Sequence, residues 1–209
     1  MQITYAELMS MEQRKRAHLI NSVGGFKSIC LIGTTDNAGQ TNLAIFSSIV
    51  HIGANPPLIC FIVRPDSVDR HTLHNIEATG HYTINHIQEN FYKAAHQTSA
   101  RYPREQSEFE ACGLHPLYRD QFLAPYVQES TLQMGLQLRQ IIKIELNNTL
   151  LIIGEIQHLY LDQSAIADDG FVDLEKLGSI TCSGLDSYHR TSKISRLSYA
   201  KPDRPLTEQ

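Results

Sequence analysis

The sequence contains no tryptophan, only four cysteines, and a charged fraction of 19%. The cysteines form no Cys-x-x-Cys pair, so a zinc site or a redox dithiol is not expected. Cys30 and Cys60 lie inside apolar runs and are expected to be buried thiols. Cys182 has small and polar neighbours, which leaves a position near a ligand open.

Basic residues are also sparse, since 18 Lys and Arg against 22 Asp and Glu give a formal net charge of -4. They are scattered along the chain, so the sequence lacks the basic patch that nucleic-acid binding requires. A few of them can still converge in space on one small anion such as a phosphate. We therefore expect no nucleic-acid partner.

Long apolar runs are missing as well, and residues 1–22 mix polar and charged residues throughout. We expect no membrane partner and a cytoplasmic location. There is no Gly-x-Gly-x-x-Gly motif and no phosphate-binding P-loop, so a bound nucleotide would be held by side chains and strand-edge amides. The length of 209 residues fits a single domain over 1–209.

The sequence is rich in β-strand patterns. Apolar or alternating runs predict strands over residues 26–36, 41–53, 58–65 and 81–87, and a hairpin over 132–146 and 149–162. The first and third strands are apolar throughout, which predicts burial on both faces. Helical spacing predicts helices over 6–22, over 67–80 with Gly80 as the cap, and over 90–99.

These elements favour one fold class. Five or six strands, an N-terminal helix and one or two inserted helices predict a mainly β fold of the barrel type, and the antiparallel hairpin argues against a doubly wound sheet. The polar stretch 89–118 is expected to decorate the barrel without building it.

The first candidate site is the strand over residues 41–48, where hydroxyl and amide groups interrupt an apolar run. Polar groups in a core strand need partners, so Thr41, Asn42, Ser47 and Ser48 are candidates for binding a ligand. The alternative is that Ser47 and Ser48 lie on a solvated strand face.

The second candidate site is the end of the third strand and the start of the next helix. Arg64, Arg70, His71 and Thr72 gather there, and guanidinium groups together with a helix N-terminus are suited to a phosphate. Ordinary helix capping by Ser67 or Asp69 is the alternative.

A metal site is not expected. His71 and His74 share a helical face, and His81 and His86 follow, but no carboxylate or cysteine partner has the spacing of a ligand set.

Taken together, these runs resemble a known family. GTTDNAGQTNLAIFSSIVHIGANPPLICFIVRP, followed by RHTLHNIEATGHYTIN, is similar to the N-terminal half of the flavin reductase-like, FMN-binding split-barrel family. LLIIGEIQHLYLD and GFVDLEKL resemble its later strand and acidic segment, so the resemblance covers most of residues 20–200 outside 87–130. The tail LDSYHRTSKISRLSYAKP resembles the end of the longer, flavoredoxin-like branch.

The resemblance implies a set of flavin-binding residues. It places Thr34, Thr41, Asn42, Ala44, Ser47 and Ser48 along the flavin. It places Arg64, His71 and Thr72 near the ribityl phosphate of the flavin. It places the tail residues Tyr188, His189 and Arg190 within reach of the flavin of either protomer. The chain departs from the family where relatives carry Asp-Thr, because it has His71-Thr72. It also has Asn147-Asn148-Thr149 where short reductases carry Gly-Asp-His, which favours the longer branch.

The resemblance further implies a function. FMN would accept hydride from NADH or NADPH and pass electrons to a flavin or a protein acceptor, at a site in a homodimer interface. An electron carrier without a nicotinamide site is the main alternative, and a ligand-binding barrel without flavin is a third. FMN is the simpler cofactor because no extension for an adenine is apparent.

Overall fold

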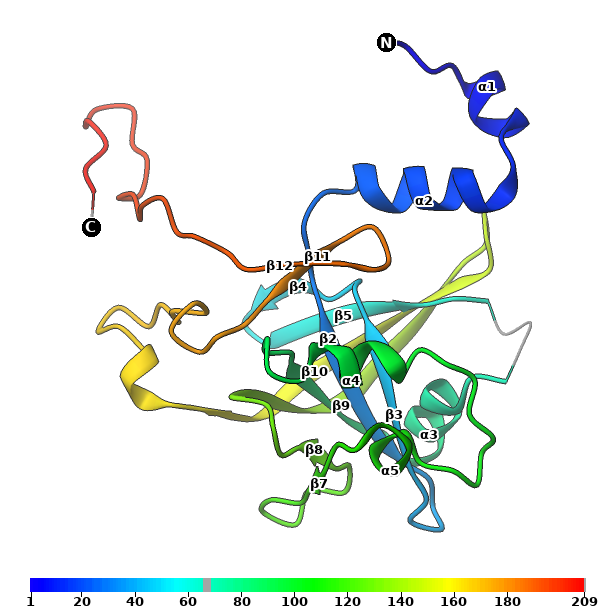
Figure 1. The fold of residues 1–209 in the computed structure, drawn as a ribbon. Helices are drawn as coiled ribbons and strands as arrows, with labels where there is room; N and C mark the ends of the chain where they lie inside the picture. Colours follow the sequence, from blue (N-terminus) through cyan, green and yellow to red (C-terminus); the bar gives the residue numbers. More distant parts are fainter. Residues whose placement is uncertain (66–68, 209) are drawn as a thin grey trace.

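The computed structural model describes residues 1–65 and 69–208, and its centre is a seven-stranded sheet in the order β3-β2-β6-β9-β10-β5-β4 (Figure 1). Every neighbouring pair is antiparallel. The strands in chain order are β2 (Cys30–Thr35), β3 (Thr41–Phe46), β4 (Val50–Ala54), β5 (Pro57–Val63), β6 (His81–His86), β9 (Leu132–Ile144) and β10 (Thr149–Leu161). The architecture is mainly β, as the sequence predicts.

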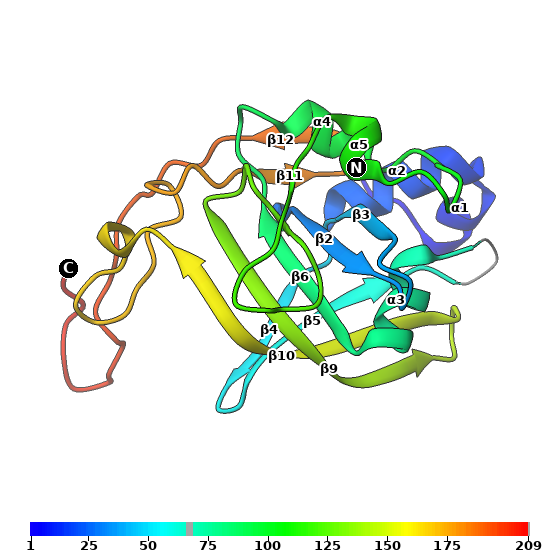
Figure 2. The same ribbon diagram turned by 90° about the horizontal axis from the view of Figure 1, so that it is seen from below.

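The sheet curls on itself but stays open between its two edge strands (Figure 2). β3 and β4 follow each other in the chain yet lie at opposite ends of the strand order. The single strand predicted over residues 41–53 is therefore wrong, since it is two strands joined by Ser47, Ser48 and Ile49.

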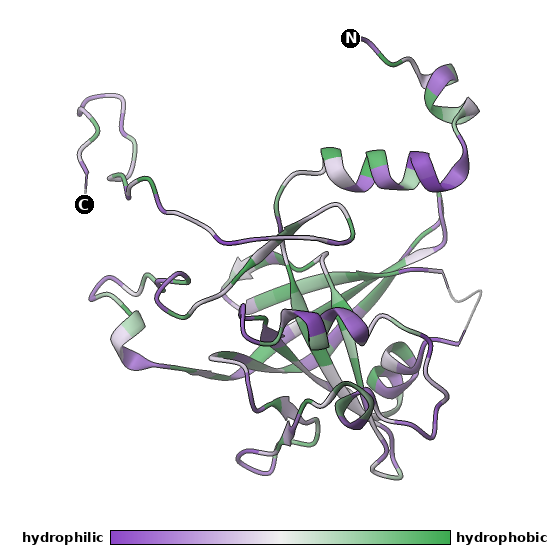
Figure 3. Cartoon of the chain, viewed as in Figure 1, coloured by the Kyte–Doolittle hydropathy of each residue, from purple (hydrophilic) through white to green (hydrophobic). Residues whose placement is uncertain are grey.

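Burial of β2 on both faces is confirmed. Cys30 and Ile32 belong to a core cluster inside the curled sheet with Phe61 and Tyr82, whereas Leu31 belongs to a second cluster on the outer face. Alternating side chains of a strand point to opposite faces, so a strand between two cores must be apolar throughout. The colours of Figure 3 show the same concentration of hydrophobic residues on the central strands.

The predicted hairpin is confirmed as β9 and β10, which pair over their whole length with register shifts after Ile153 and Ile156. The predicted helix at 67–80 is observed as α3 (His71–Thr79), and Gly80 ends it with a positive φ of 70°. Glycine suits that left-handed position because it has no Cβ.

The single helix predicted over residues 6–22 is wrong. The chain forms α1 (Tyr5–Ser10) and α2 (Gln13–Val23), because Thr4 makes a capping box with Glu7 and Glu12 accepts a hydrogen bond from Lys15 N at the start of α2. Apolar spacing alone did not reveal these two separate N-caps. Both helices project from one end of the barrel (Figure 1).

The polar stretch 89–118 adds no strand to the seven-stranded sheet, as predicted, but it packs more closely on the barrel than expected. This part of the chain forms α4 (Tyr92–Gln97), α5 (Glu108–Cys112) and the start of a small hairpin of β7 (Pro116–Leu117) and β8 (Tyr126–Val127). Phe109, Leu114 and Val127 are buried in the second core cluster against β2 and β3. The stretch therefore completes the outer core.

The C-terminal part returns to the N-terminal end of the barrel. After the short 3-10 helix η1 (Gln163–Ala165), β11 (Thr181–Ser183) and β12 (Ser187–His189) form a three-stranded sheet with β1 (Lys27–Ser28). Beyond β12 the chain runs outward as an extended arm (Figure 1). Within the described residues, no helix has the length and apolar character needed to cross a bilayer.

Candidate functional site

The join between the two edge strands carries two of the predicted residues. Ser48 Oγ accepts a hydrogen bond from Ile62 N at 3.0 Å and donates to Ile62 O at 3.3 Å, so it pairs with β5 where the strand has broken. The Ser47 hydroxyl lies within hydrogen-bonding reach of the Cys182 thiol. Burial raises the pKa of that thiol, and Lys27 and the Ser47 hydroxyl partly oppose this effect. Both serines are partly buried and lie in the join between β3 and β4, outside either strand.

Three other predicted residues form a buried polar network with one another. Asn42 Nδ2 donates to Thr72 Oγ1 at 3.0 Å and lies 3.4 Å from Thr34 Oγ1. Asn75 Nδ2 donates to Thr34 Oγ1 at 3.1 Å. The network ties α3 to β2 and β3, and it offsets the cost of burying four polar side chains. Asn75 was not among the predicted site residues. It could have been found, because it lies three residues after Thr72 and therefore on the same face of the predicted helix.

A small cavity lies beside this network. Its volume is about 10 Å³, enough for roughly one water molecule. Arg104 reaches the cavity from the loop before α5, and its Nη2 lies 3.6 Å from Asp36 Oδ2. The pKa of Asp36 is lowered, chiefly because its carboxylate accepts a hydrogen bond from the Gln40 amide and also because Arg104 is close, while burial acts in the opposite direction. Predicted residues Thr41, Asn42 and His71 line the cavity, which is far too small for a flavin.

The predicted phosphate site lies at the N-terminus of α3. Arg64 is exposed at the end of β5, and Arg70 is the residue before the first turn of α3. Arg70 Nη2 donates to Pro65 O at 3.4 Å, and within the described residues its buried Nε has no hydrogen-bond partner. A buried guanidinium donor that lacks an acceptor at a helix N-terminus fits a phosphate oxygen.

Helix capping by Asp69 is wrong as an alternative, because the Arg70 position has no side-chain cap. The Asp69 carboxylate lies 3.3 Å from His71 Nε2 and 3.0 Å from His74 Nδ1. Capping by Ser67 falls outside the described residues. Of the predicted phosphate residues, Thr72 turns inward to Asn42, His71 is partly exposed in the first turn of α3, and Arg64 is exposed just after β5.

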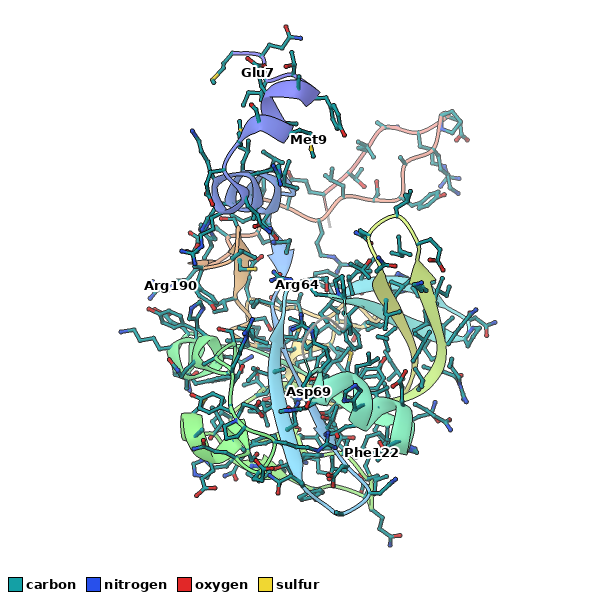
Figure 4. The ribbon with its side chains drawn as sticks, turned by 90° about the vertical axis from the view of Figure 1, so that its right-hand side faces the viewer. Glu7, Met9, Arg64, Asp69, Phe122 and Arg190 are labelled. Atoms are coloured by element: carbon teal, nitrogen blue, oxygen red, sulfur yellow. The ribbon has the colours of Figure 1, made fainter. Side chains whose placement is uncertain are left out.

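The predicted tail residues lie on β12, each with its own partner. Tyr188 donates to or accepts from His96 Nδ1 at 2.7 Å, and His189 Nε2 lies 2.8 Å from Ser183 Oγ. Burial is the main cause that raises the pKa of Tyr188 to about 12. Arg190 makes two hydrogen bonds to the Glu89 carboxylate, one of them at 2.7 Å. Figure 4 shows Arg190 well separated from Arg64 and Asp69.

A cleft of about 660 Å³ borders Arg190. Its walls come from three segments of the chain, with these lining residues: Gln88, Glu89, Asn90, Glu175, Gly178, Ser179, Ile180, Arg190 and Thr191. Of the predicted residues, this cleft contains Arg190. The other predicted site residues lie in two regions. One is the polar network and the N-terminus of α3, and the other is the region of Ser47, Cys182 and β12.

Thiols and imidazoles do not build a further centre. Cys30, Cys60 and Cys182 are buried and free, and burial raises the pKa of Cys30. Within residues 1–65 and 69–208, no three His, Cys, Asp or Glu side chains are placed to hold a metal ion. The polar groups of the described residues that are placed to meet a ligand are those around α3 and around β12.

Comparison with known proteins is consistent with this donor set. The family model described as "Flavin reductase like domain" matches residues 23–174. A crystal structure from Shewanella frigidimarina NCIMB 400, provisionally described as a flavin reductase with a split barrel domain, is 48% identical, covers 96% of this chain and 100% of its own, and superposes with a TM-score of 0.92.

Two more distant structures share the fold. Nitrilotriacetate monooxygenase component B from Bacillus cereus is 21% identical with a TM-score of 0.82, covering 94% of this chain and 98% of its own. Flavoredoxin of Desulfovibrio vulgaris (Miyazaki F) is 23% identical with a TM-score of 0.70, covering 85% and 91%. The predicted split-barrel fold is confirmed.

Proposed function

Because the chain belongs to the flavin reductase-like domain family, we propose that it binds FMN and transfers electrons from NADH or NADPH through it to a flavin or a protein acceptor. FMN supplies the redox chemistry when bound, since its ring takes up hydride and releases electrons. The protein needs only to hold, orient and tune the cofactor. A catalytic dyad is therefore not required.

The observation that carries the proposal is the donor set at the start of α3. Arg70 brings a cationic group to the N-terminus of α3, and its Nε is a buried donor without an acceptor in the described residues, while Arg64 is exposed just after β5, six residues earlier in the chain. A dianionic phosphate would satisfy this donor and interact favourably with the helix dipole. The buried network of Asn42 and Thr72 fixes α3 against β3 and so positions this corner.

The flavin ring would lie along the free edge of β3 and the join that follows it. β3 is an edge strand, and at its other end Leu43 N already donates to Glu108 Oε2 at 2.9 Å. The edge from Ala44 to Ser48 is the part nearest to Cys182 and β12. Backbone groups there can hydrogen-bond a flat polar ring without any catalytic side chain.

An electron carrier without its own nicotinamide site is the second candidate function. At 147–149, where short flavin reductases have Gly-Asp-His, this chain has a turn closed by Asn147 Oδ1, which accepts from Thr149 N at 3.1 Å and from Thr149 Oγ1 at 2.8 Å. Such a self-contained turn offers no histidine toward a substrate. Flavoredoxin of Desulfovibrio vulgaris (Miyazaki F) shares the fold.

The test is the visible absorption spectrum of the purified protein, followed by NADH and then NADPH under anaerobic conditions. Flavin bands that bleach with one nucleotide would support the oxidoreductase and name its donor. Bands that persist with both but bleach with dithionite would support the carrier. A colourless protein that also fails to bind added FMN contradicts both candidate functions.

A further inference from the structure

The cleft beside Arg190 is lined by none of the residues that the proposed function assigns to FMN. Its walls are the loop after β6, the chain just before β11 and the first residues after β12. Figure 4 shows Arg190 well separated from Arg64 and Asp69. The volume of about 660 Å³ falls within the usual range for sites that bind small molecules. The cleft is therefore large enough for a ligand of its own.

One wall of the cleft carries a hydrogen-bond donor that lacks an acceptor. Gln88 is only 7% exposed, and its Oε1 accepts a hydrogen bond from Thr131 N at 3.3 Å. Its Nε2 is buried and has no hydrogen-bond partner within the described residues. The backbone of Gln88 is fixed by a β-bridge to Ser179. Because an unpaired buried donor costs free energy, a ligand oxygen placed at Nε2 would be stabilised.

Glu175 supplies the complementary group. Its backbone is held in place, since Glu175 N donates to Asp173 Oδ1 at 3.1 Å and Glu175 O accepts from Gly178 N at 2.9 Å. Its side chain is exposed and has no partner among residues 1–65 and 69–208. A carboxylate accepts hydrogen bonds and donates none. The cleft therefore offers one unpaired donor and one unpaired acceptor.

The charges of the lining residues disfavour an ionic ligand. Arg190 is the one cation among them, and its guanidinium already donates two hydrogen bonds to the Glu89 carboxylate. A phosphate or a carboxylate would therefore meet the unpaired Glu175 without a free cation to balance it. An ammonium group has no acceptor, so it would leave Gln88 Nε2 unpaired. A neutral ligand that both donates and accepts fits this pair of residues.

Hydroxyl groups meet this requirement, because each one can donate and accept a hydrogen bond. Seven of the nine lining residues have a polar group on the side chain, and none has an aromatic ring on which a flat ligand could stack. Ile180 and the aliphatic parts of the longer side chains can contact the C–H groups of a ligand. A chain of neighbouring hydroxyls on a carbon backbone matches both kinds of surface.

We propose that this cleft binds a neutral polyol through its adjacent hydroxyls, with Gln88 Nε2 donating to one hydroxyl and the Glu175 carboxylate accepting from another. The ribose of a nucleoside and the ribityl chain of riboflavin both carry this chemistry. The proposal does not depend on FMN binding at α3, so it goes beyond the proposed function. If the purified protein bound no FMN, the assignment of the cleft would still stand.

The test is a titration of the ¹⁵N-labelled full-length protein, followed by NMR, with four probes. Ribitol represents the ribityl chain, and D-ribose represents the sugar of a nucleoside. The third probe, 1,5-pentanediol, has a carbon chain of the same length but no adjacent hydroxyls, and inorganic phosphate tests for an anion site. The backbone amide signals of Gly178 and Thr191 report binding in the cleft.

Two variants at exposed positions change the cleft. Glu175→Ala removes the acceptor, and Glu110→Ala on α5 is its matched control. Thr191→Trp places a bulky ring in the cleft, and Ser195→Trp on the same C-terminal arm is its matched control. Circular dichroism checks that all four variants are folded.

We expect ribitol or D-ribose to shift the signals of Gly178 and Thr191, whereas 1,5-pentanediol and phosphate should not. Glu175→Ala should raise the Kd roughly tenfold or more, because a hydrogen bond to a charged group is lost. Thr191→Trp should abolish binding, and both controls should bind as the wild type does. Tighter binding of ribitol would identify the ribityl chain as the source of the polyol, and tighter binding of ribose would identify a nucleoside sugar.

Three results would overturn the proposal. The first is that neither polyol shifts the signals of the lining residues. The second is that 1,5-pentanediol or phosphate binds in the cleft as tightly as the polyols, since adjacent hydroxyls would then not be what is recognised. The third is that polyol binding is unchanged in Glu175→Ala or in Thr191→Trp, which would place the polyol elsewhere on the protein.

Discussion

The hydroxyl of Tyr82 on β6 lies against the backbone of Gly154 on β10, with β9 between the two strands. Tyr82 is fully buried in the inner core, and its ring packs edge-on against Phe61. A Cβ at Gly154 would collide with the hydroxyl and would come within 2.7 Å of Cζ. The glycine therefore makes room for a tyrosine that fills the barrel.

Gly154→Ala should destabilise the protein by about 1–3 kcal/mol, the usual cost of forcing an extra methyl into a packed core. Urea unfolding followed by circular dichroism measures it. Gly53→Ala on the edge strand β4 is the control, since a Cβ there meets only Pro56 O at 3.8 Å. Tyr82→Phe removes the nearest atom, so the penalty should shrink in that background. An equal penalty in both backgrounds would mean that the hydroxyl is not the obstacle.

Much of the barrel could be predicted from the sequence because its strands have local signals. Apolar runs marked β2 and β5, alternation marked β9 and β10, and Gly80 marked the end of α3. Gly154 also lies in a sequence recognisable as a strand. The requirement for a glycine at this position could not be predicted, because it comes from Tyr82, more than seventy residues earlier.

The other parts of the fold and of the candidate site could not be predicted, because they depend on contacts between residues that are far apart in the sequence. α5 was missed because Phe109 gains its burial from packing against β3, and Glu108 fixes it there through Leu43 N. The β7–β8 hairpin turns at Asp120 and Gln121, both with positive φ, a conformation that is uncommon for residues other than glycine. Asn42 and Thr72 were singled out separately, but their hydrogen bond joins residues thirty positions apart.

Asn75→Ala should lower the free energy of unfolding by about 1–3 kcal/mol, because it removes the shorter of the two hydrogen bonds that the buried Thr34 hydroxyl accepts and leaves only the 3.4 Å contact from Asn42. Denaturant titration gives the value. The exposed Asn90 provides a matched substitution, and Asn90→Ala should stay within about 0.5 kcal/mol of the wild type. If both variants unfold alike, the network around α3 does not contribute to stability.

Arg64→Ala and Arg70→Ala should each weaken FMN binding by about 1.5–3 kcal/mol, or roughly tenfold to more than a hundredfold in Kd, because each removes a charge-assisted contact to the phosphate. Titration by quenching of FMN fluorescence measures Kd. Arg101→Ala, at an exposed position before α5, should bind as the wild type does. Riboflavin, which lacks the phosphate, should not discriminate among the variants. Unchanged FMN affinity in both arginine variants would place the phosphate elsewhere.

His86 should make the protein sensitive to mild acid. Burial lowers the pKa of its imidazole to about 4, and Nδ1 lies 3.0 Å from Ser179 Oγ. Because the folded pKa lies below the unfolded value near 6.5, the stabilising contribution of neutral His86 is complete above pH 6.5 and is lost as the pH falls toward 4. The loss should reach about 3 kcal/mol over this window.

Urea unfolding at several pH values measures this loss of stability. His86→Gln should be less stable at pH 7 but should lose this part of the pH dependence, whereas His51→Gln, at an exposed position on β4, should keep it. A wild-type unfolding free energy that is flat between pH 6.5 and 4 would show that His86 can be protonated without leaving the fold.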